Sequence, residues 1–273
     1  MTATDARATS ITWIGHSTVL VELDGVRLLT DPLLRTRLGH VRRVAAPPDL
    51  DALVDLDAVL VSHVHYDHLD LPSLRRLGRS LHIVAPLGGG RILRGRGFKD
   101  VTELDAGDEL ELGSVTIRAT HAEHERRRRP LGPEARPLGY VVAGSSRLYF
   151  AGDTDLFDAM AGLVPALDVA LLPIAGWGAK VPHGHLDPER AARAVVLLQP
   201  RVAVPIHWGT YRRIALQSGA ELLRAPAERF VQLVHELAPA VDVQLLPVGG
   251  RFSLAALGRR ALADDVQPAG VRT

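Results

Sequence analysis

The chain repeats part of its own sequence, and this repeat constrains the fold more than any other feature. LDAVLV at residues 56–61 is matched by LDVALL at residues 167–172, and HYDHLDLPSLRRL from His65 is matched by HGHLDPERAARAV from His183. Buried strands rich in Leu and Val resemble one another by chance. Because several matches occur in the same order, they favour a duplicated structural unit.

Strand-like and helix-like segments alternate within both halves. Short apolar, β-branched runs are separated by Gly, Pro and Asp turns, which predicts strands. A helix is predicted from Pro188, with Asp187 at its N-cap, and another over residues 227–237. The predicted strands are residues 11–14, 18–23, 26–30, 58–62, 81–84, 115–119, 140–143, 147–151, 169–174, 202–206 and 243–247.

These elements predict an α/β fold. Each half would form a sheet with helices on one face, and stacking the two sheets would bury both sheets and leave the helices outside. The expected architecture is a four-layer αββα sandwich built from two pseudo-repeated halves. We expect one domain over residues 10–256 and a loosely held tail over residues 257–273.

The composition excludes several classes of function. With 32 Lys and Arg against 31 Asp and Glu, and only 4% aromatic residues, neither charge nor base stacking predicts nucleic-acid binding. The absence of cysteine excludes disulfides and thiolate metal ligands. No apolar run approaches the roughly 18 residues of a membrane span, and the first residues lack an apolar signal region. We expect a cytoplasmic protein without stable membrane insertion.

Two common catalytic patterns are incomplete. A dinucleotide-binding G-x-G-x-x-G would need glycine where Leu93 stands, and a serine-hydrolase G-x-S-x-G lacks its second glycine after Ser17. We therefore reject both classes.

Ligand-type side chains are concentrated in VSHVHYDHLD, residues 61–70. His63 and His65 stand two apart at the end of a predicted strand, so their side chains should point the same way. Asp67 and His68 follow in a turn, which lets them reach a neighbouring point. Packing alone explains such a cluster poorly. It predicts two adjacent divalent metal ions, zinc first, with manganese or iron as alternatives.

Further ligands should also follow strands, because loops at strand ends can turn toward a shared site. Asp153 follows RLYFA, His207 lies in VPIHWGT, and either His121 or His124 follows VTIRA. Each of these residues alone is more typical of a turn or a cap. Together they complete a ligand set for two ions.

The motif HVHYDH resembles the HxHxDH signature of the metallo-β-lactamase superfamily. The segments WIGHSTVLVELDGVRLLTDPLL, LDAVLVSHVHYDHLD, LYFAGDTDLF, HLDPERA and PIHWGTY are similar to the branch that holds bacterial ascorbate phosphate lactonases and N-acylphosphatidylethanolamine-hydrolysing phospholipase D. The resemblance extends from about Trp13 to about residue 250. It is specific for the superfamily but not for a substrate, because this scaffold hosts many reactions.

The resemblance implies a metal-binding role for each candidate ligand. By this resemblance, one metal would be bound by His63, His65 and a third histidine. The other metal would be bound by Asp67, His68 and His207, and Asp153 would bridge the two metals. We favour His124 as the third histidine, because His121 falls where relatives often carry proline.

The residues and the resemblance both predict a binuclear metal-dependent hydrolase. A hydroxide bridging two divalent cations is a strong nucleophile near neutral pH, and it would attack an ester, lactone or phosphodiester of a small substrate. We expect Asp67, Asp153 and His185 to take part in catalysis, with His185 contacting substrate or protonating the leaving group. The alternatives are phospholipase D-like hydrolysis of a membrane lipid and a noncatalytic metal-binding scaffold.

Residues around the predicted ligands have less specific roles. Asp31 in LLTDP is a candidate to orient a ligand histidine, since ligating imidazoles usually have such a partner. His16, Tyr66 and Asp155 are candidates to face the cleft, but residues of these types are more typical of turns and packing, which we favour.

The run from Arg126 to Arg129 is the strongest charge feature. Its ordinary interpretation is a solvated loop. The alternative is an anion clamp, because guanidinium groups match the geometry of phosphate and carboxylate. That alternative would suit a phosphorylated or carboxylated substrate.

Overall fold

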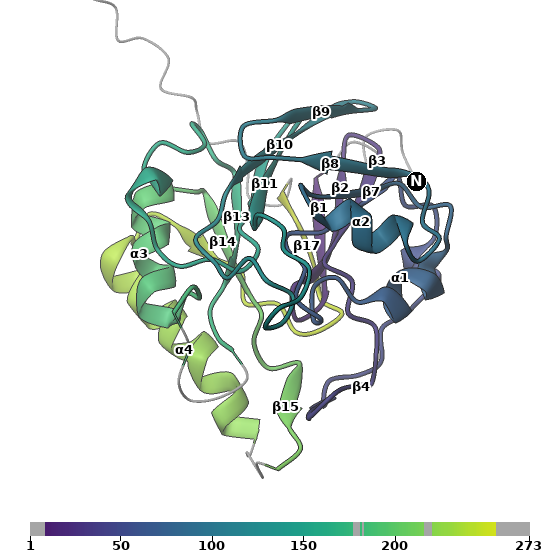
Figure 1. The fold of residues 1–273 in the computed structure, drawn as a ribbon. Coiled ribbons are helices and arrows are strands. Elements are labelled where there is room, and N and C mark those ends of the chain that lie inside the picture. The colour runs from purple at the N-terminus through teal and green to yellow at the C-terminus, as the bar shows by residue number, and fades with distance from the viewer. Residues whose placement is uncertain (1–8, 177–180, 182, 216–219, 255–273) are drawn as a thin grey trace, which may run out of the picture.

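The computed structural model describes residues 9–176, 181, 183–215 and 220–254. Within them the chain forms two stacked sheets with helices on both outer sides (Figure 1). This arrangement confirms the predicted four-layer αββα sandwich. The tail predicted at residues 257–273, and the predicted end of the domain at residue 256, lie outside the described residues.

The first sheet has the strand order β17-β1-β2-β3-β6-β7-β8. Its strands β1 to β3 form an antiparallel meander, and β3, β6, β7 and β8 run parallel. The bounds are β1 Ser10–Gly15, β2 Thr18–Leu23, β3 Val26–Thr30, β6 Ala58–Leu60, α1 Leu71–Leu77, β7 Ile83–Pro86, α2 Gly89–Arg94, β8 Val101–Leu104 and β17 Arg251–Ser253, with a short 3₁₀ helix at Asp51–Leu53.

The second sheet has the order β16-β14-β13-β12-β11-β10-β9 and repeats this topology. Its strands β10 to β12 form an antiparallel meander, and β12, β13, β14 and β16 run parallel. The bounds are β9 Glu109–Leu112, β10 Val115–His121, β11 Leu138–Ala143, β12 Arg147–Phe150, β13 Val169–Pro173, α3 Pro188–Leu198, β14 Val202–Ile206, α4 Ala220–Leu237 and β16 Asp242–Val243, with a 3₁₀ helix at Asp158–Met160. The shared topology supports the duplication inferred from the sequence.

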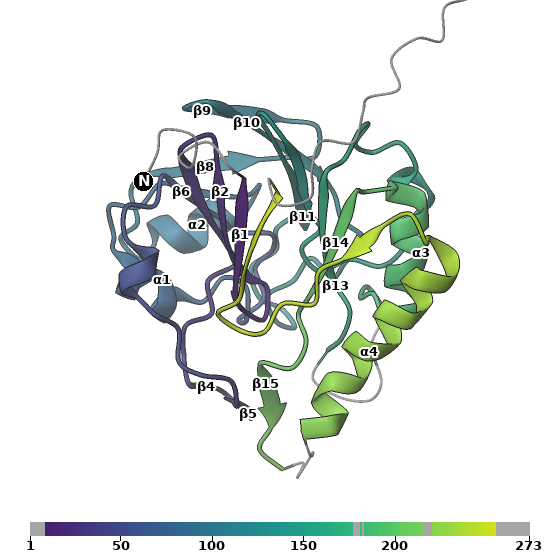
Figure 2. The same cartoon turned by 180° about the vertical axis from the view of Figure 1, so that it is seen from behind.

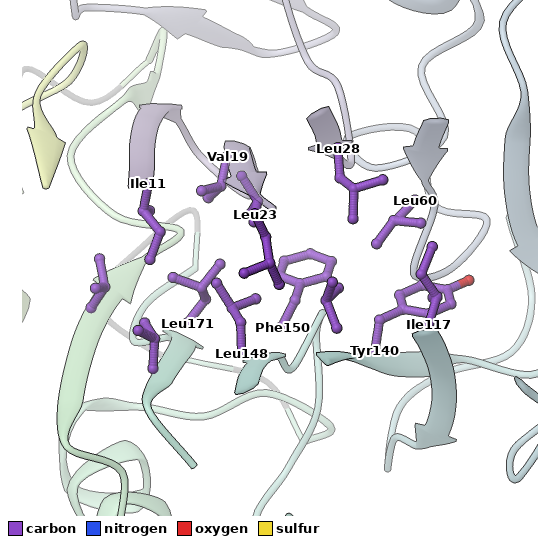
Figure 3. Close-up of a cluster of buried hydrophobic side chains, with 14 of the residues drawn as sticks. Ile11, Val19, Leu23, Leu28, Leu60, Ile117, Tyr140, Leu148, Phe150 and Leu171 are labelled. Atoms are coloured by element: carbon purple, nitrogen blue, oxygen red, sulfur yellow. The ribbon is translucent and has the colours of Figure 1, made fainter. Parts of the chain in front are cut away.

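The two sheets pack face to face over an apolar core. Alternate residues of each strand point into it, as Val19 and Leu23 of β2 do, because side chains alternate across a strand. Tyr140 and Phe150 reach the same core from the second sheet, and Figure 3 shows side chains of both sheets interleaved. Each such side chain contributes about 1.5–3 kcal/mol by leaving water.

The other side of each sheet is covered by helices. Leu29 and Val59 of the first sheet belong to a cluster with Leu74 of α1, and Leu172 of the second sheet belongs to one with Phe230 of α4. Figure 2 shows these helix layers from behind, on opposite sides of the sandwich. Both sheets are therefore buried on two faces, which leaves their strand ends as the places where polar residues can gather.

The predicted helix from Pro188 forms as α3. The side chain of Asp187 accepts a hydrogen bond from the backbone N–H of Arg190 at 2.8 Å, and Pro188 occupies the first turn. Both features stabilise a helix start, because the first N–H groups of a helix lack partners within it.

Several predicted elements have other bounds in the structure. The strand predicted at residues 58–62 ends at Leu60, so His63 and His65 lie in the loop after it and strand periodicity does not orient them. The strand predicted at residues 243–247 is reduced to Asp242–Val243, which pairs with β14 and with no other described strand. The helix predicted at residues 227–237 begins at Ala220 and continues through Pro226.

A small three-stranded sheet lies outside the sandwich and was not predicted. It has the order β15-β5-β4, with β4 Arg37–Leu38, β5 Val41–Arg43 and β15 Tyr211–Arg213. Its strands are too short to carry a clear alternation in the sequence. None of the described helices is long and apolar enough to cross a membrane.

Candidate metal centre

The predicted ligands meet where several strands end. The parallel strands β3, β6, β12 and β14 are followed by loops that carry polar side chains toward one edge of the sandwich. Asp31 follows β3, the segment 61–70 follows β6, Asp153 follows β12 and His207 follows β14. Residues from both halves of the repeat therefore contribute to one site.

One group contains His63, His65 and His124. Nε2 of His63 and Nε2 of His124 each lie 3.0 Å from Nδ1 of His65. All candidate ligand atoms of this group lie within 4.8 Å of one another. Three imidazole nitrogens at these separations can hold one cation and leave further positions for other ligands.

A second group contains Asp67, His68 and His207, together with His16. The candidate ligand atoms of these residues also lie within 4.8 Å of one another. Nε2 of His68 lies 3.6 Å from Oδ2 of Asp67, and the rings of His68 and His207 are stacked with centroids 5.5 Å apart. One carboxylate among imidazoles suits a divalent cation such as zinc, manganese or iron.

Asp153 lies between the two groups. Its Oδ2 is 3.2 Å from Nε2 of His68 and 3.5 Å from Nε2 of His207, both members of the second group. It also forms a potential ligand group with His124, a member of the first. A buried carboxylate in this position can contact two ions at once.

Each candidate ligand histidine directs its other ring nitrogen to an acceptor or a hydroxyl. Such partners fix the tautomer and leave the facing nitrogen with a lone pair for a metal. The pairs are His63 Nδ1 with Ser62 Oγ at 3.0 Å, His65 Nε2 with the Arg127 carbonyl at 3.0 Å, His68 Nδ1 with Asp31 Oδ2 at 2.7 Å, His124 Nδ1 with the Gly184 carbonyl at 2.6 Å and His207 Nδ1 with the Ala175 carbonyl at 2.7 Å.

Asp31 supports both groups. Its Oδ2 accepts from His68 Nδ1 and from the Ser62 hydroxyl, and its Oδ1 accepts from the Ser62 backbone N–H at 2.7 Å. The Ser62 oxygen in turn lies 3.0 Å from Nδ1 of His63. Asp31 therefore orients a histidine of each group, which matches the role that the sequence suggested for it.

The carboxylates of the site favour positive charge next to them. Burial lowers the pKa of His124 to about 4 and the pKa of His207 to about 3, so both rings are neutral at pH 7. Burial also acts to lower the pKa of His68, but the carboxylates of Asp153, Asp67 and Asp31 outweigh it and raise that pKa well above its usual value. Divalent cations would supply the same positive charge.

The side chains fit such cations. Burial acts to raise the pKa of Asp153, but the charge of His68 and hydrogen bonds from His185 and His68 hold it well below its usual value, so the group is a carboxylate. Its Oδ1 is buried and accepts no hydrogen bond from the described residues. Burying an ionised oxygen without a donor is costly, and a metal ion removes that cost. The donor set of imidazoles and carboxylates is the one that zinc and similar ions prefer.

His16 is a member of the site, although the sequence favoured a turn residue over a place in the cleft for it. It is 2% exposed, and its Nε2 lies 3.2 Å from Oδ2 of Asp67. Its backbone N–H donates to Thr210 Oγ1 at 2.8 Å, and its carbonyl accepts from the His207 N–H at 2.9 Å. The sequence signal that could have identified His16 as a site residue is its position directly after a strand, and the same signal identified Asp153.

His185 approaches Asp153 from the second half. Its Nε2 lies 3.4 Å from Oδ2 of Asp153, and its side chain is 20% exposed. Burial acts to lower its pKa, but the hydrogen bond and charge of Asp153 raise it above its usual value. A partly exposed imidazole beside the candidate ligands can contact a substrate.

The loop that carries His185 is tied to the site. Asp155 accepts from the Gly184 N–H at 3.1 Å and from Arg190 at 2.8 Å, so it orders this loop and does not face a substrate. Gly184 has a φ of +80°, and a Cβ there would lie 3.2 Å from Nδ1 of His124. Glycine is needed at this position because other residues rarely adopt this backbone and would press on a candidate ligand.

The remaining candidates lie away from the two groups. His121 is exposed, lies 3.2 Å from Glu123 and packs its ring against Phe157. Tyr66 is 47% exposed and stacks with the guanidinium of Arg128 at 4.1 Å. The structure thus brings His124, and not His121, together with His63 and His65.

The four arginines of the run do not share one role. Arg128 donates to the carbonyls of Val64 and Leu69 at 2.5 and 3.2 Å, so it holds the ligand loop and is not directed at a substrate. Arg127 pairs with Glu134 at 3.2 Å, and its carbonyl faces His65. Arg126 and Arg129 are exposed, as expected of a solvated loop.

Comparison with known proteins agrees with this geometry. The family described as Beta-lactamase superfamily domain matches residues 26–208. A UPF0173 metal-dependent hydrolase of Methanopyrus kandleri is 34% identical over 89% of this chain and 98% of its own. N-acyl-phosphatidylethanolamine-hydrolyzing phospholipase D 1 of Caenorhabditis elegans is 34% identical over 73% of this chain and 64% of its own.

A solved structure shares the fold. The metallo hydrolase of the archaeon Ignicoccus hospitalis superposes with a TM-score of 0.70 at 27% identity, over 90% of this chain and 98% of its own. The family match covers most of the chain and includes residues of both candidate ligand groups. The chain therefore belongs to the metallo-β-lactamase superfamily of metal-dependent hydrolases.

Proposed function

We propose that this protein is a binuclear hydrolase that cleaves an ester, lactone or phosphodiester of a small substrate, including a phosphorylated or carboxylated one. The observation that carries the proposal is the buried carboxylate of Asp153, which lies beside two separate groups of candidate ligands. Zinc is the first expectation for the ions, with manganese or iron as alternatives.

The proposed ligands divide between two ions. His63, His65 and His124 would hold one ion, Asp67, His68 and His207 the other, and Asp153 would contact both. When bound, the pair of ions would supply Lewis acidity and a nucleophile at neutral pH.

The chain's own residues would orient the substrate and move protons. His185 lies beside Asp153 and is partly exposed, so its Nε2 can hold a proton for a leaving oxygen. Asp31 and Ser62 would hold the ligand imidazoles in one tautomer. Asp67 would be held in turn by His16. The proposed hydrolysis needs no side-chain nucleophile.

The test combines metal content with turnover. We would measure metals in purified protein by elemental mass spectrometry and assay lactone, phosphodiester and phospholipid substrates, using Asp153→Ala as the site variant. About two metals per chain, lost together with activity in Asp153→Ala, would support the proposal. Asp168→Ala is a suitable control, because Asp168 pairs with Arg201 and takes no part in the candidate ligand groups.

Two other results of this experiment would favour the alternative functions. Turnover restricted to the phospholipid would favour a phospholipase D-like enzyme, the activity in the name of the Caenorhabditis elegans relative. Retained metal without turnover of any substrate would favour a noncatalytic scaffold. The cytoplasmic location expected from the sequence stays a prediction, which cell fractionation would test.

A further inference from the structure

The small three-stranded sheet carries a concentrated positive charge. Residues 33–48 contain four arginines and residues 208–215 contain two more, and neither segment contains Asp or Glu. The whole chain is balanced, with 32 Lys and Arg against 31 Asp and Glu. Arg43 is buried and Arg35 pairs with Asp70, so Arg37, Arg42, Arg212 and Arg213 are the arginines that give this sheet a local basic surface.

The strand register places three arginines in a row. Arg37 of β4 pairs with Arg42 of β5, and Arg42 pairs with Arg212 of β15. Residues directly opposite one another share a face of the sheet. Arg37 and Arg42 are exposed, whereas the neighbours of Arg42 along β5, Val41 and Arg43, are buried. The row therefore lies on the outward face.

Arg37 and Arg42 do not attach the small sheet to the sandwich. The inward face already attaches the sheet, because Arg43 donates to the Ile14 carbonyl at 2.6 Å and Tyr211 packs with Val41 and Leu33. Like charges directly opposite each other across strands are destabilising. No acidic side chain of the described residues forms an ion pair with Arg37 or Arg42. Arg37 and Arg42 therefore face each other without an acidic partner among the described residues, which favours an anionic ligand at this place.

Exposed apolar side chains flank the arginines. Val44 directly follows β5 and is 42% exposed, and Ile214 directly follows β15 and is 48% exposed. Leu222, in the first turns of α4, is 67% exposed. Both views show the small sheet and the N-terminal end of α4 at the same end of the molecule (Figures 1 and 2).

We propose that this basic face, Arg37, Arg42 and Arg212 flanked by Val44 and Ile214, docks the protein on an anionic lipid bilayer. Arginines next to exposed aliphatic side chains match a surface that offers phosphates above an apolar layer. Nucleic acid would use the charges but leave the aliphatic side chains in water. A second copy of this face would be repelled by its own charge.

Docking at this face would bring the metal centre close to the bilayer. Thr210, directly before β15, accepts from the His16 backbone N–H at 2.8 Å, and the Tyr211 ring lies 5.9 Å from the His16 ring. The inference goes beyond the proposed hydrolase. It concerns binding, which is measured without turnover, so it stands or fails separately from the catalytic proposal.

The experiment is sedimentation of the full chain with lipid vesicles. Phosphatidylcholine vesicles with and without one third phosphatidylglycerol would be compared for the wild type and for Arg37→Gln/Arg42→Gln. The matched control is Arg75→Gln/Arg76→Gln, which removes two exposed charges from α1. Each juxtamembrane arginine favours binding by about fivefold, so the first pair should bind anionic vesicles about thirtyfold more weakly. The control pair should bind like the wild type.

A second variant tests the apolar flanks. Val44→Ser/Ile214→Ser should weaken vesicle binding and leave binding to a duplex DNA fragment unchanged. Unchanged metal content and melting temperature would show that both double variants are folded. The proposal is overturned if the wild type does not bind anionic vesicles, or if the control pair loses as much binding as the test pair. Tighter binding to DNA with the same arginine dependence, or self-association through this face, would also overturn it.

Discussion

At the scale of single residues, the site depends on side chains that hold the candidate ligands. Asp31, Ser62 and three backbone carbonyls each face the outer nitrogen of an imidazole. Such partners usually matter nearly as much as the ligands, because they set the tautomer and the ring orientation. His16 is the partner of Asp67, and it offers a direct test.

We predict that His16→Asn weakens one of two metal-binding steps by about 10–100-fold and leaves the other unchanged. Asn tolerates the left-handed backbone of this position, where φ is 56°, but is too short to reach Asp67. His16→Gln retains a donor at the required length and should recover part of the affinity. Competition titration with a chromophoric chelator measures both steps. Equal weakening of the two steps in both variants would contradict the prediction.

A second residue prediction concerns Gly184. Gly184→Ala forces a side chain onto a backbone with a φ of +80° and into contact with His124. We expect a loss of about 1–2 kcal/mol in the free energy of unfolding, together with weaker metal binding. Gly162→Ala is the matched control, because Gly162 also has a positive φ, of +74°, but no atom lies within 4 Å of the place that an added Cβ would take. Denaturant titration and metal analysis compare the two variants.

At the scale of elements, short segments are fixed by polar side chains from elsewhere in the sequence. Arg128 holds the loop 61–70 through its backbone carbonyls, and Glu103 of β8 caps the start of α2. Where the chain turns to present ligands, such contacts supply the backbone hydrogen bonds that regular secondary structure supplies elsewhere. They explain why a loop without strand periodicity still brings His63 and His65 together.

We predict that Arg128→Gln weakens metal binding and lowers stability by about 1–3 kcal/mol, because it leaves buried carbonyls without a charged donor. Arg126→Gln, in the same run but exposed, should have little effect on either quantity. Metal titration and denaturant unfolding check both variants. If Arg126→Gln alone raised the KM for an anionic substrate, the anion clamp would become the better interpretation of the run.

The cap of α2 gives a prediction for pH. Burial acts to raise the pKa of Glu103, but hydrogen bonds from Arg94, Gly88 and Gly90 lower it below its usual value. A carboxylate with a lowered folded pKa stabilises the fold above its unfolded pKa and loses that effect as pH falls. Glu103→Gln should therefore cost about 1 kcal/mol at pH 7 and less near pH 4. Denaturant unfolding of both proteins at the two pH values tests this; a difference that grows in acid would contradict it.

At the scale of the whole molecule, metal binding and folding should be coupled. The two sheets belong to different halves of the repeat, and the candidate ligands come from loops of both. Ions bound there would join the halves and offset the repulsion among Asp31, Asp67 and Asp153. Binding at 100 times Kd stabilises the folded state by about 2.7 kcal/mol.

We predict that a chelator lowers the melting temperature by roughly 5–10 °C for a chain of this size. Adding zinc back should restore the original value, and Asp153→Ala should be insensitive to both treatments. Calorimetry with and without chelator measures the effect. An unchanged melting temperature in wild-type protein shown to contain metal would contradict the coupling.

Local sequence patterns were sufficient to predict the fold class, the family and most of the candidate ligands. Strand patterns, turn residues and the ordered repeat are local signals, and His63, His65, Asp67 and His68 stand together in the chain. The third histidine was a preference, since His121 and His124 both follow the same strand. Only the tertiary structure showed His124 beside His65 and His121 at the surface.

Contacts between distant segments became visible only in the tertiary structure. His16, the direction of Arg128 and the basic face all depend on which strands and loops lie next to one another. No local pattern marks a pair such as His16 and Asp67, or β5 and β15, because their proximity is set by the packing of two sheets and not by neighbouring residues. Local physics fixes the elements, and burial of the shared core fixes which of their ends meet.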